Sequence, residues 1–352
     1  MITVKVPARI CLLGDHQDYL GLPVIAASID RYLTLEANPQ EKACFTFELI
    51  DLGQTRELAL QIDESSVQKG DFLAATLAVL MRKGIVAKGG YHIKIRSTIP
   101  VNAGVSSSSA LVIAFIRFLA SAFTTGGIED QQIADWANEA EVDFFGDPGG
   151  LMDHYSIALE ELRVIYPSTR TTKELPRPND LHLLLVESGI AKQTVGVLSK
   201  AKEKALEALA IVQSVNPKLN YHNAEKSDIL AYKSLLSSEL FTYWQAGIAN
   251  HSITKLAIAL LTRPVSPTTI ADLADLINQH QFYLQTAIQN TPEHMQKQMQ
   301  VALNAGGLAA KVIGSGGGGC FFVLSTLAKQ PQIMKGLLKQ GVQTAYPINI
   351  TP

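Results

Sequence analysis

The stretch Ile99-Pro-Val-Asn-Ala-Gly-Val-Ser-Ser-Ser-Ser-Ala110 joins a β-rich run, residues 91–96, to a mostly apolar run, residues 110–123, that predicts a buried helix. Small side chains let a ligand approach the backbone. A helix start adds unpaired N–H groups and the positive end of the helix dipole, which favour phosphate. The alternative is a serine cap on an ordinary helix, but four consecutive serines exceed what one cap requires. The stretch therefore predicts a phosphate-binding turn, which is not a Walker loop because it has no G-K-[ST] sequence.

A second glycine-rich stretch, Lys311-Val-Ile-Gly-Ser-Gly-Gly-Gly-Gly-Cys320, lies between two apolar runs that predict strands. Five of the six residues 314–319 are glycine, so this loop can adopt positive φ repeatedly and lie against a bulky group. A flexible linker is the alternative, but spacer sequence rich in Ser, Glu or Pro is missing on both sides. We therefore expect a tight loop between two strands.

Two further segments carry acidic side chains next to glycines. The alternating residues 4–11 predict a strand, and the polar run Gly14-Asp-His-Gln-Asp-Tyr19 follows it. Burying such a run is costly unless a polar ligand uses it, although a solvated turn is the simpler alternative. Glu141 and Asp153, separated by the pair Gly149-Gly150, would suit one metal ligand and one base. Taken alone, this second pattern is weak, because acidic residues near turns are usually solvated.

The composition excludes several classes of protein. The chain has 352 residues, with 30 Lys plus Arg against 32 Asp plus Glu, so its formal net charge is −2. Binding to nucleic acid or to an anionic membrane requires a basic surface, which this balance does not supply. The longest apolar stretch, residues 110–116, is far shorter than the roughly 20 residues that span a bilayer. We expect no nucleic acid and no membrane among its partners.

Cysteine usage indicates the compartment. Cys11, Cys44 and Cys320 lie far apart and form no C-x-x-C pair, so we expect neither a disulfide framework nor a zinc site. Lys5, Arg9 and Asp15 interrupt the N-terminal run where a signal peptide would be apolar. These observations predict a cytoplasmic protein.

The length suggests about two domains. Residues 166–180 contain three prolines and no apolar periodicity, so we place the boundary there and expect domains at 1–178 and 179–352. For the second half the patterns predict a strand at 181–186, helices at about 192–214, 223–262, 267–290 and 293–305, a strand–loop–strand unit at 310–325 and a helix near 330–340.

Together these segments resemble, in order and spacing, the three motifs of the GHMP kinase superfamily, which includes galactokinase, homoserine kinase, mevalonate kinase and phosphomevalonate kinase. Residues 100–110 are similar to its phosphate motif P-x-x-x-G-L-x-S-S-A, and residues 311–320 to its third motif. Residues 14–19 are similar to the galactokinase signature G-E-H-T-D-Y, and residues 150–153 to G-I-M-D. The resemblance implies an α+β fold of two domains with the active site in the cleft between them. The N-terminal domain would have a mixed sheet with a left-handed β-α-β unit, and the C-terminal domain would be ferredoxin-like.

The resemblance further implies an ATP-dependent kinase that transfers the γ-phosphate of Mg·ATP to a sugar hydroxyl and gives a sugar 1-phosphate. Asp153 would take or orient the hydroxyl proton, and Arg9 would polarise the hydroxyl and stabilise developing charge. The implied ATP-binding residues are Gly104, Ser106, Ser107, Ser108 and Ser109; the implied sugar-binding residues are Asp15, His16, Asp18, Gly150 and Asp153; and the implied Mg²⁺ ligands are Ser108 and Glu141.

Departures from the galactokinase pattern keep other acceptors open. Asp15 replaces the signature glutamate, Gln17 replaces threonine, and Ser109 stands where alanine is usual. The acceptor could therefore be a uronic acid, another pentose or hexose, or mevalonate, although mevalonate-type members place lysine at the position of Arg9. A non-catalytic sensor of sugar and ATP is the alternative from another class, but such proteins often lose the base or the arginine. The oligomeric state is not predicted.

Overall fold

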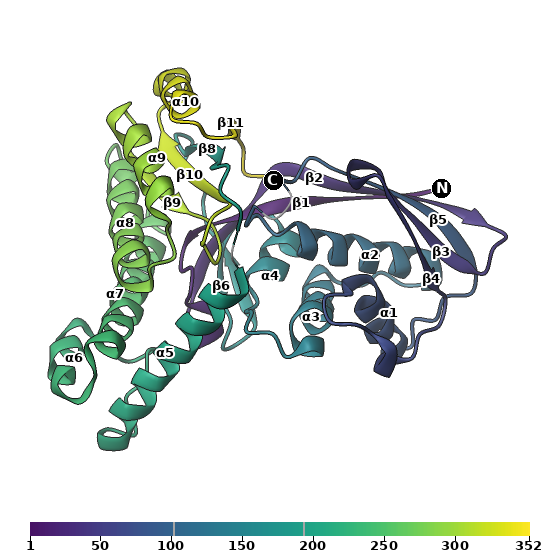
Figure 1. Cartoon of the computed structure of the whole chain (residues 1–352), viewed down its shortest axis with the longest axis horizontal. Helices are drawn as coiled ribbons and strands as arrows, with labels where there is room; N and C mark the ends of the chain where they lie inside the picture. Colours follow the sequence, from purple (N-terminus) through teal and green to yellow (C-terminus); the bar gives the residue numbers. More distant parts are fainter. Residues whose placement is uncertain (101–102, 193) are drawn as a thin grey trace.

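The structure is a computed structural model, and it describes residues 1–100, 103–192 and 194–352. Residues 101 and 102 of the phosphate motif, and residue 193, lie outside the described part. The strands form two sheets, one in each half of the chain, and helices pack beside each sheet (Figure 1). The expected α+β class is confirmed.

The larger sheet has the order β4-β3-β5-β2-β6-β7, and β1 pairs along β2. The strand β2 is 17 residues long, so it pairs with β5 through its second part and with β6 through its first. Strands β3 and β5 run parallel and are joined through β4 and the helix α1, which makes the expected β-α-β unit. The left hand of this unit stays a prediction. The strand bounds are β1 Ile2–Leu13, β2 Val24–Gln40, β3 Cys44–Leu49, β4 Gln54–Ala59, β5 Gly90–Ser97, β6 Leu162–Tyr166 and β7 Thr171–Glu174.

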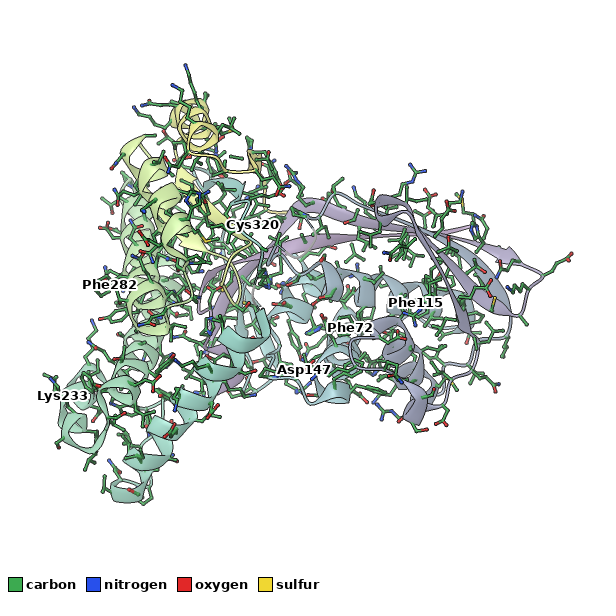
Figure 2. The ribbon with its side chains drawn as sticks, in the orientation of Figure 1. Phe72, Phe115, Asp147, Lys233, Phe282 and Cys320 are labelled. Atoms are coloured by element: carbon green, nitrogen blue, oxygen red, sulfur yellow. The ribbon has the colours of Figure 1, made fainter. Side chains whose placement is uncertain are left out.

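Four helices lie on one face of this sheet: α1 Phe72–Arg82, α2 Ser107–Phe123, α3 Asp130–Glu141 and α4 Met152–Leu159. Helices α2 and α4 pack against the strands, and α1 and α3 pack against these helices. The central one, α2, is as buried as its apolar sequence predicts. Figure 2 shows Phe115 of α2 beneath the sheet, where its ring meets Phe45 and Phe47 edge-on. This packing fixes the start of α2, and therefore the serine run, against the end of β1.

The second sheet is antiparallel, with strands β8 His182–Glu187, β9 Ala309–Val312, β10 Cys320–Ser325 and β11 Thr344–Ile348 in the order β11-β8-β10-β9. Helices lie between β8 and β9 and between β10 and β11, which is the β-α-β-β-α-β arrangement of a ferredoxin-like domain. The expectation for the C-terminal half is therefore confirmed, with additional helices inserted after β8.

The helices of this half are α5 Thr194–Val215, α6 Lys226–Ala231, α7 Ser238–Leu261, α8 Thr269–Tyr283, α9 Glu293–Asn304 and α10 Gln330–Lys339. The single helix predicted at 223–262 is wrong, because α6 ends at Ala231 and α7 begins anew after Ser237. The Ser237 hydroxyl accepts the N–H of Leu240 and caps the new start. No helix of the described residues has the length and apolar character that crossing a membrane requires.

The chain crosses between the two sheets twice. It leaves the first sheet after Glu174 and enters the second at His182, and the proposed boundary between residues 178 and 179 lies in this segment. At its end the chain returns to the first sheet, where Ile350 bridges Ile29 of β2. Arg177 of the first crossing donates to the carbonyl of Ile350 in the second, at 2.8 Å, so the two crossings lie together.

Candidate active site

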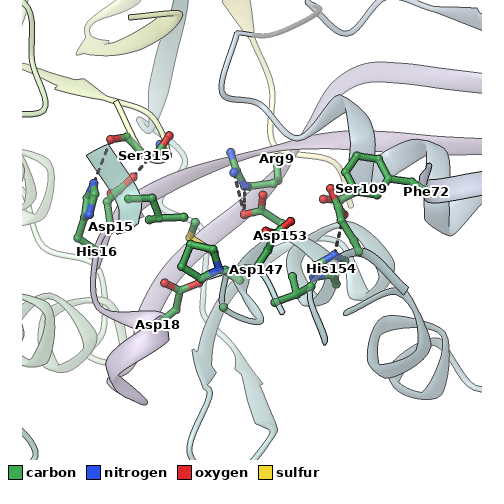
Figure 3. Close-up of a pocket in the computed structure, with 18 of the residues that line it drawn as sticks. Arg9, Asp15, His16, Asp18, Phe72, Ser109, Asp147, Asp153, His154 and Ser315 are labelled. Carbon is green, nitrogen blue, oxygen red and sulfur yellow. Dashed lines mark hydrogen bonds and ion pairs between the residues drawn. The ribbon is translucent and has the colours of Figure 1, made fainter. Parts of the chain in front are cut away.

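A cavity of about 270 Å³ opens where the two halves meet (Figure 3). The first half contributes Arg9 from β1 and the turn that follows this strand, together with acidic residues of α3 and α4. The second half contributes Lys192 and the start of the glycine loop. The cavity therefore gathers side chains from all the segments that the sequence analysis singled out.

The central interaction is an ion pair between Arg9 and Asp153. Nε and Nη2 of Arg9 donate to Oδ1 of Asp153 at 2.9 and 2.7 Å, and Nη1 donates to the carbonyl oxygen of Gly104 at 2.6 Å. The Ser106 hydroxyl donates to the other oxygen of Asp153. Asp153 is thus oriented by the strand β1 on one side and by the phosphate motif on the other.

This environment fixes the charge of Asp153. Burial would raise the pKa of this carboxyl, but the charge of Arg9 and the hydrogen bond from Ser106 outweigh burial and lower it. Asp153 is therefore ionised at neutral pH and can accept a proton. Two non-glycine residues with left-handed backbone, Ser106 and His16 at φ 62°, lie at this site, and such strain is concentrated at functional sites.

Asp18 approaches Asp153 across a glycine. A Cβ on Gly150 would stand 2.1 Å from Oδ2 of Asp18, so only glycine allows this carboxylate its position. Oδ1 of Asp18 accepts the N–H of Tyr19 at 2.9 Å, and Asp18 lines the cavity together with Gly150. Burial, and then the negative charge of Asp153, raises the pKa of Asp18 to about 6.

Two residues of the same turn are held by the protein itself. The buried Asp15 pairs with Lys311 and accepts the N–H of Gly314 at 2.8 Å. Burial would raise the pKa of Asp15, but the positive charge of Lys311 outweighs this effect, and the pKa is lowered. His16 contacts the hydroxyl of Tyr19 at 3.2 Å and the carbonyl of Ser315 at 3.0 Å through its two ring nitrogens. Both side chains line the cavity, but their hydrogen bonds already connect the two halves.

Three of the four serines line two different cavities, while Ser106 donates to Asp153. Ser109 is buried and lines the first cavity together with Glu141, and Figure 3 shows it close to His154. Ser107 and Ser108 line a neighbouring apolar cavity of about 170 Å³ instead. The division follows from helix geometry, because successive residues at the start of α2 are rotated by about 100°. Ser109, and not the Ser108 of the implied metal pairing, therefore lines the same cavity as Glu141.

Comparisons with known proteins agree with this geometry. A family model described as the GHMP kinases N terminal domain matches residues 71–161, and the model for the GHMP kinases C terminal domain matches residues 257–343. Together the two matches span half of the chain and lie one in each structural half. The chain belongs to the GHMP kinase family.

Relatives within the GHMP kinase family include several galactokinases. That of Thermococcus kodakarensis is 28% identical over 255 residues, which is 65% of this chain and 71% of the relative. That of Clostridium tetani is 24% identical over 338 residues, 92% of this chain and 83% of the relative. Among solved structures, Lactococcus lactis galactokinase complexed with galactose has a TM-score of 0.87 at 20% identity and covers 99% of this chain and 93% of its own. Methanococcus jannaschii mevalonate kinase has a TM-score of 0.74 at 18% identity, covering 100% and 98%.

Three side chains of this GHMP kinase site were missed by the sequence analysis. His154 contacts Glu141 at 2.8 Å through Nε2, and Lys311 is the buried partner of Asp15. Lys192 lines the cavity beside Arg9. His154 directly follows Asp153 and could have been noticed, but neither lysine lies in a segment whose pattern indicates a partner.

The raised pKa of Asp18 gives a first prediction. Above pH 6 the carboxylate can accept charge-assisted hydrogen bonds from an acceptor molecule, and below pH 6 it is protonated and loses them. We expect the KM of the acceptor to rise as the pH falls from 7 to 5, with its midpoint near 6, while the KM of ATP stays flat. Asp18→Asn should raise the acceptor KM by about tenfold or more and abolish this pH dependence. Steady-state kinetics over this pH range checks this prediction. Parallel changes in the KM values of the acceptor and of ATP would show that the turn with Asp18 has a structural role instead.

Proposed function

We propose that this GHMP kinase transfers the γ-phosphate of Mg·ATP to a hydroxyl group of a sugar, and that the anomeric hydroxyl is the acceptor. Its relatives that are named galactokinase support a sugar as the acceptor. The observation that carries the proposal is the Arg9–Asp153 pair, which lies between the serine turn and Asp18. The serine turn on one side of the pair suits the phosphates of ATP, and Asp18 on the other side suits the hydroxyl groups of a sugar. A non-catalytic sensor would not need an ionised carboxylate held by two donors at this position.

The reaction that this geometry supports is an in-line phosphoryl transfer. The acceptor oxygen forms a bond to the γ-phosphorus, the bond from this phosphorus to the β,γ-bridging oxygen breaks, and its electron pair leaves with ADP. Asp153 receives the hydroxyl proton, or orients the hydroxyl if the transition state is loose. Arg9 keeps Asp153 ionised and has N–H groups left to stabilise charge on the transferred group.

The nucleotide would lie along the start of α2. The second cavity has apolar walls from Leu33, Leu49, Ile95 and Leu111 next to Ser107 and Ser108, which suits a purine base. From there the phosphates would cross the unpaired N–H groups of α2 toward Arg9. A nucleotide in this orientation would connect the two cavities and present its γ-phosphate to Asp153.

The residues present fit a magnesium ion. Glu141 and a serine hydroxyl supply the oxygen ligands that Mg²⁺ prefers, and this ion usually takes its remaining ligands from phosphates and water. When bound, the ion would neutralise phosphate charge. Glu141 would hold it while His154, on the far side, fixes the carboxylate.

The division of the serines predicts different effects of two matched variants. Ser109→Ala removes the hydroxyl that shares the cavity with Glu141 and should raise the Mg²⁺ concentration needed for nucleotide binding by about fivefold, the worth of one hydroxyl contact. Ser108→Ala should shift it less. Calorimetric ATP titrations at several Mg²⁺ concentrations measure both. A shift with Ser108→Ala alone would restore the pairing of Ser108 with Glu141 and require the start of α2 to rearrange.

An ADP-release screen tests the function directly. The purified chain is incubated with Mg·ATP and a panel of galactose, other hexoses, pentoses, uronic acids and mevalonate. We expect turnover with a sugar, and phosphorus NMR of the product should show coupling to the anomeric proton. Turnover with mevalonate and with no sugar would show that mevalonate is the acceptor. Binding of sugar and ATP without any turnover would show that the protein is a sensor.

A further inference from the structure

Among the described residues, one cation of the active-site cavity forms no ion pair. Lys192 lies just before α5, in the second half of the chain, yet it lines the same cavity as Arg9 and Asp153. Its Cε lies 3.7 Å from where a Cβ would stand on Gly104, the glycine of the phosphate motif. A lysine of one half thus reaches over the phosphate turn of the other.

The other cations near the cavity are engaged. Three N–H groups of Arg9 donate to Asp153 and Gly104, Lys311 is paired with Asp15, and Lys69 at the cavity mouth is 2.7 Å from Asp147. Within the described part of the chain, Lys192 forms no ion pair within 4.0 Å and no side-chain hydrogen bond. Its ammonium carries three N–H donors, and it lines a cavity together with several carboxylates. Lys192 is partly buried, and a partly desolvated ammonium without a carboxylate partner is stabilised when an anion joins it.

We propose that Lys192 binds the γ-phosphate of ATP from the side opposite the serine turn and stabilises the charge on the phosphoryl group during its transfer. This inference rests on the proposed kinase function and adds a second catalytic cation to Arg9. As the bond to the bridging oxygen breaks, negative charge spreads over the γ-phosphate oxygens and the leaving ADP. The compact, mobile ammonium of Lys192 can follow this charge, whereas the guanidinium of Arg9 stays fixed to Asp153.

The electrostatic surroundings of Lys192 support a role as an anion ligand. Burial, and then the positive charge of Arg9, lowers its pKa to about 8, against the opposing effects of Asp153 and Cys320. His16 lines the same cavity, where burial first, and the charge of Lys192 among other causes, lower its pKa. Lys192 is therefore protonated at neutral pH in the free enzyme and loses its charge above pH 8. A bound phosphate would favour the charged form.

The test compares three variants with the wild type, after the sugar screen has established which acceptor is turned over. Lys192→Met removes the charge and keeps the apolar stem, and Lys192→Arg keeps a charge that does not titrate. Lys200→Met removes an exposed lysine of the following helix α5, which pairs with Glu239. We expect Lys192→Met to lower kcat by about 10- to 100-fold, the worth of a charge-assisted hydrogen bond. Lys200→Met should have little effect.

Two further measurements separate a catalytic from a structural role. The affinity for ADP with aluminium fluoride, which imitates the transferred phosphoryl group, should fall with kcat in Lys192→Met, while the affinity for ADP alone barely changes. The kcat/KM for ATP of the wild type should decline above pH 8, because it reports the free enzyme, and Lys192→Arg should remove this decline and recover much of the rate.

The outcomes distinguish this inference from the proposed function. A wild-type enzyme that turns over a sugar, together with a folded Lys192→Met variant of unchanged kcat and unchanged affinity for the fluoride complex, overturns the role of Lys192 alone. Equal losses of affinity for ADP and for the fluoride complex would also overturn it, because Lys192 would then bind the nucleotide without favouring the transition state. If Lys192→Met does not fold, the pH profile of Lys192→Arg still decides the question. No turnover by the wild type with any acceptor would refute the kinase function itself.

Discussion

Replacing Asp153 by asparagine is expected to lower kcat by about 10²–10⁴-fold, the usual contribution of a general base. The amide keeps the shape of the carboxylate and can still accept from Arg9, but it cannot take a proton at neutral pH. ATP affinity should be nearly unchanged, because the phosphates would lie on the serine turn and not on Asp153. If the transition state is loose and the carboxylate only orients the hydroxyl, the loss will be at the low end of this range.

Steady-state turnover with calorimetric ATP titration beside it measures both effects. Asp143→Asn is a suitable control, because Asp143 is an exposed acid of the connection that leads from α3 to α4, the helix of Asp153. A kcat close to that of the wild type would remove Asp153 from the mechanism. Loss of the folded state, seen by circular dichroism, would show that the Arg9–Asp153 pair is needed for stability.

Replacing Lys311 by methionine is expected to cost about 3–5 kcal/mol of the free energy of unfolding, the typical cost of removing one member of a buried ion pair. Lys311 is fully buried, and its ammonium donates to Asp15 and to the carbonyls of Cys11 and Val312 at 3.1 and 2.9 Å. Methionine fills most of the space but leaves Asp15 as an uncompensated buried charge between the two halves.

The double variant Asp15→Asn/Lys311→Met provides the control for this prediction. The amide oxygen of the asparagine can still accept the N–H of Gly314, and no buried charge remains. We expect the double variant to recover most of the lost stability in urea unfolding, since replacing a whole buried pair is often neutral. A double variant as unstable as Lys311→Met would instead show that the hydrogen bonds of Lys311 to the backbone carry the stability.

Local patterns predicted much of the fold. The apolar residues 110–123 gave α2, and the glycines between two apolar runs gave β9, β10 and their loop. Strands β6 and β7 and the helix α4 were not predicted, because all three are short. The strand β6 also pairs with a partner that is distant in the sequence, the strand β2. The first part of β2, residues 24–29, was not predicted either, since a stretch that is buried on both faces has no alternation to detect.

In the candidate site, too, some residues could be predicted from the sequence and others could not. The resemblance to GHMP kinase motifs indicated Arg9 and Asp153, and the structure places them in contact although 144 residues separate them. The pairing of Asp15 with Lys311, 296 residues apart, could not be inferred, because nothing in either segment specifies the other. The sequence also could not show which serine faces Glu141, because this depends on where the first turn of α2 begins.

The two crossings between the halves, together with the Asp15–Lys311 pair at the cleft, attach the second half to the first at two separated places. Hinged closure, the common way in which two-domain enzymes assemble a site around a substrate, would have to break a buried ion pair each time the cleft opened. The site is therefore preorganised: its charged groups are already in place before either substrate arrives. A hinged enzyme uses part of the binding free energy of its substrates to bring its two halves together. Here this free energy is available to align the phosphoryl donor with its acceptor.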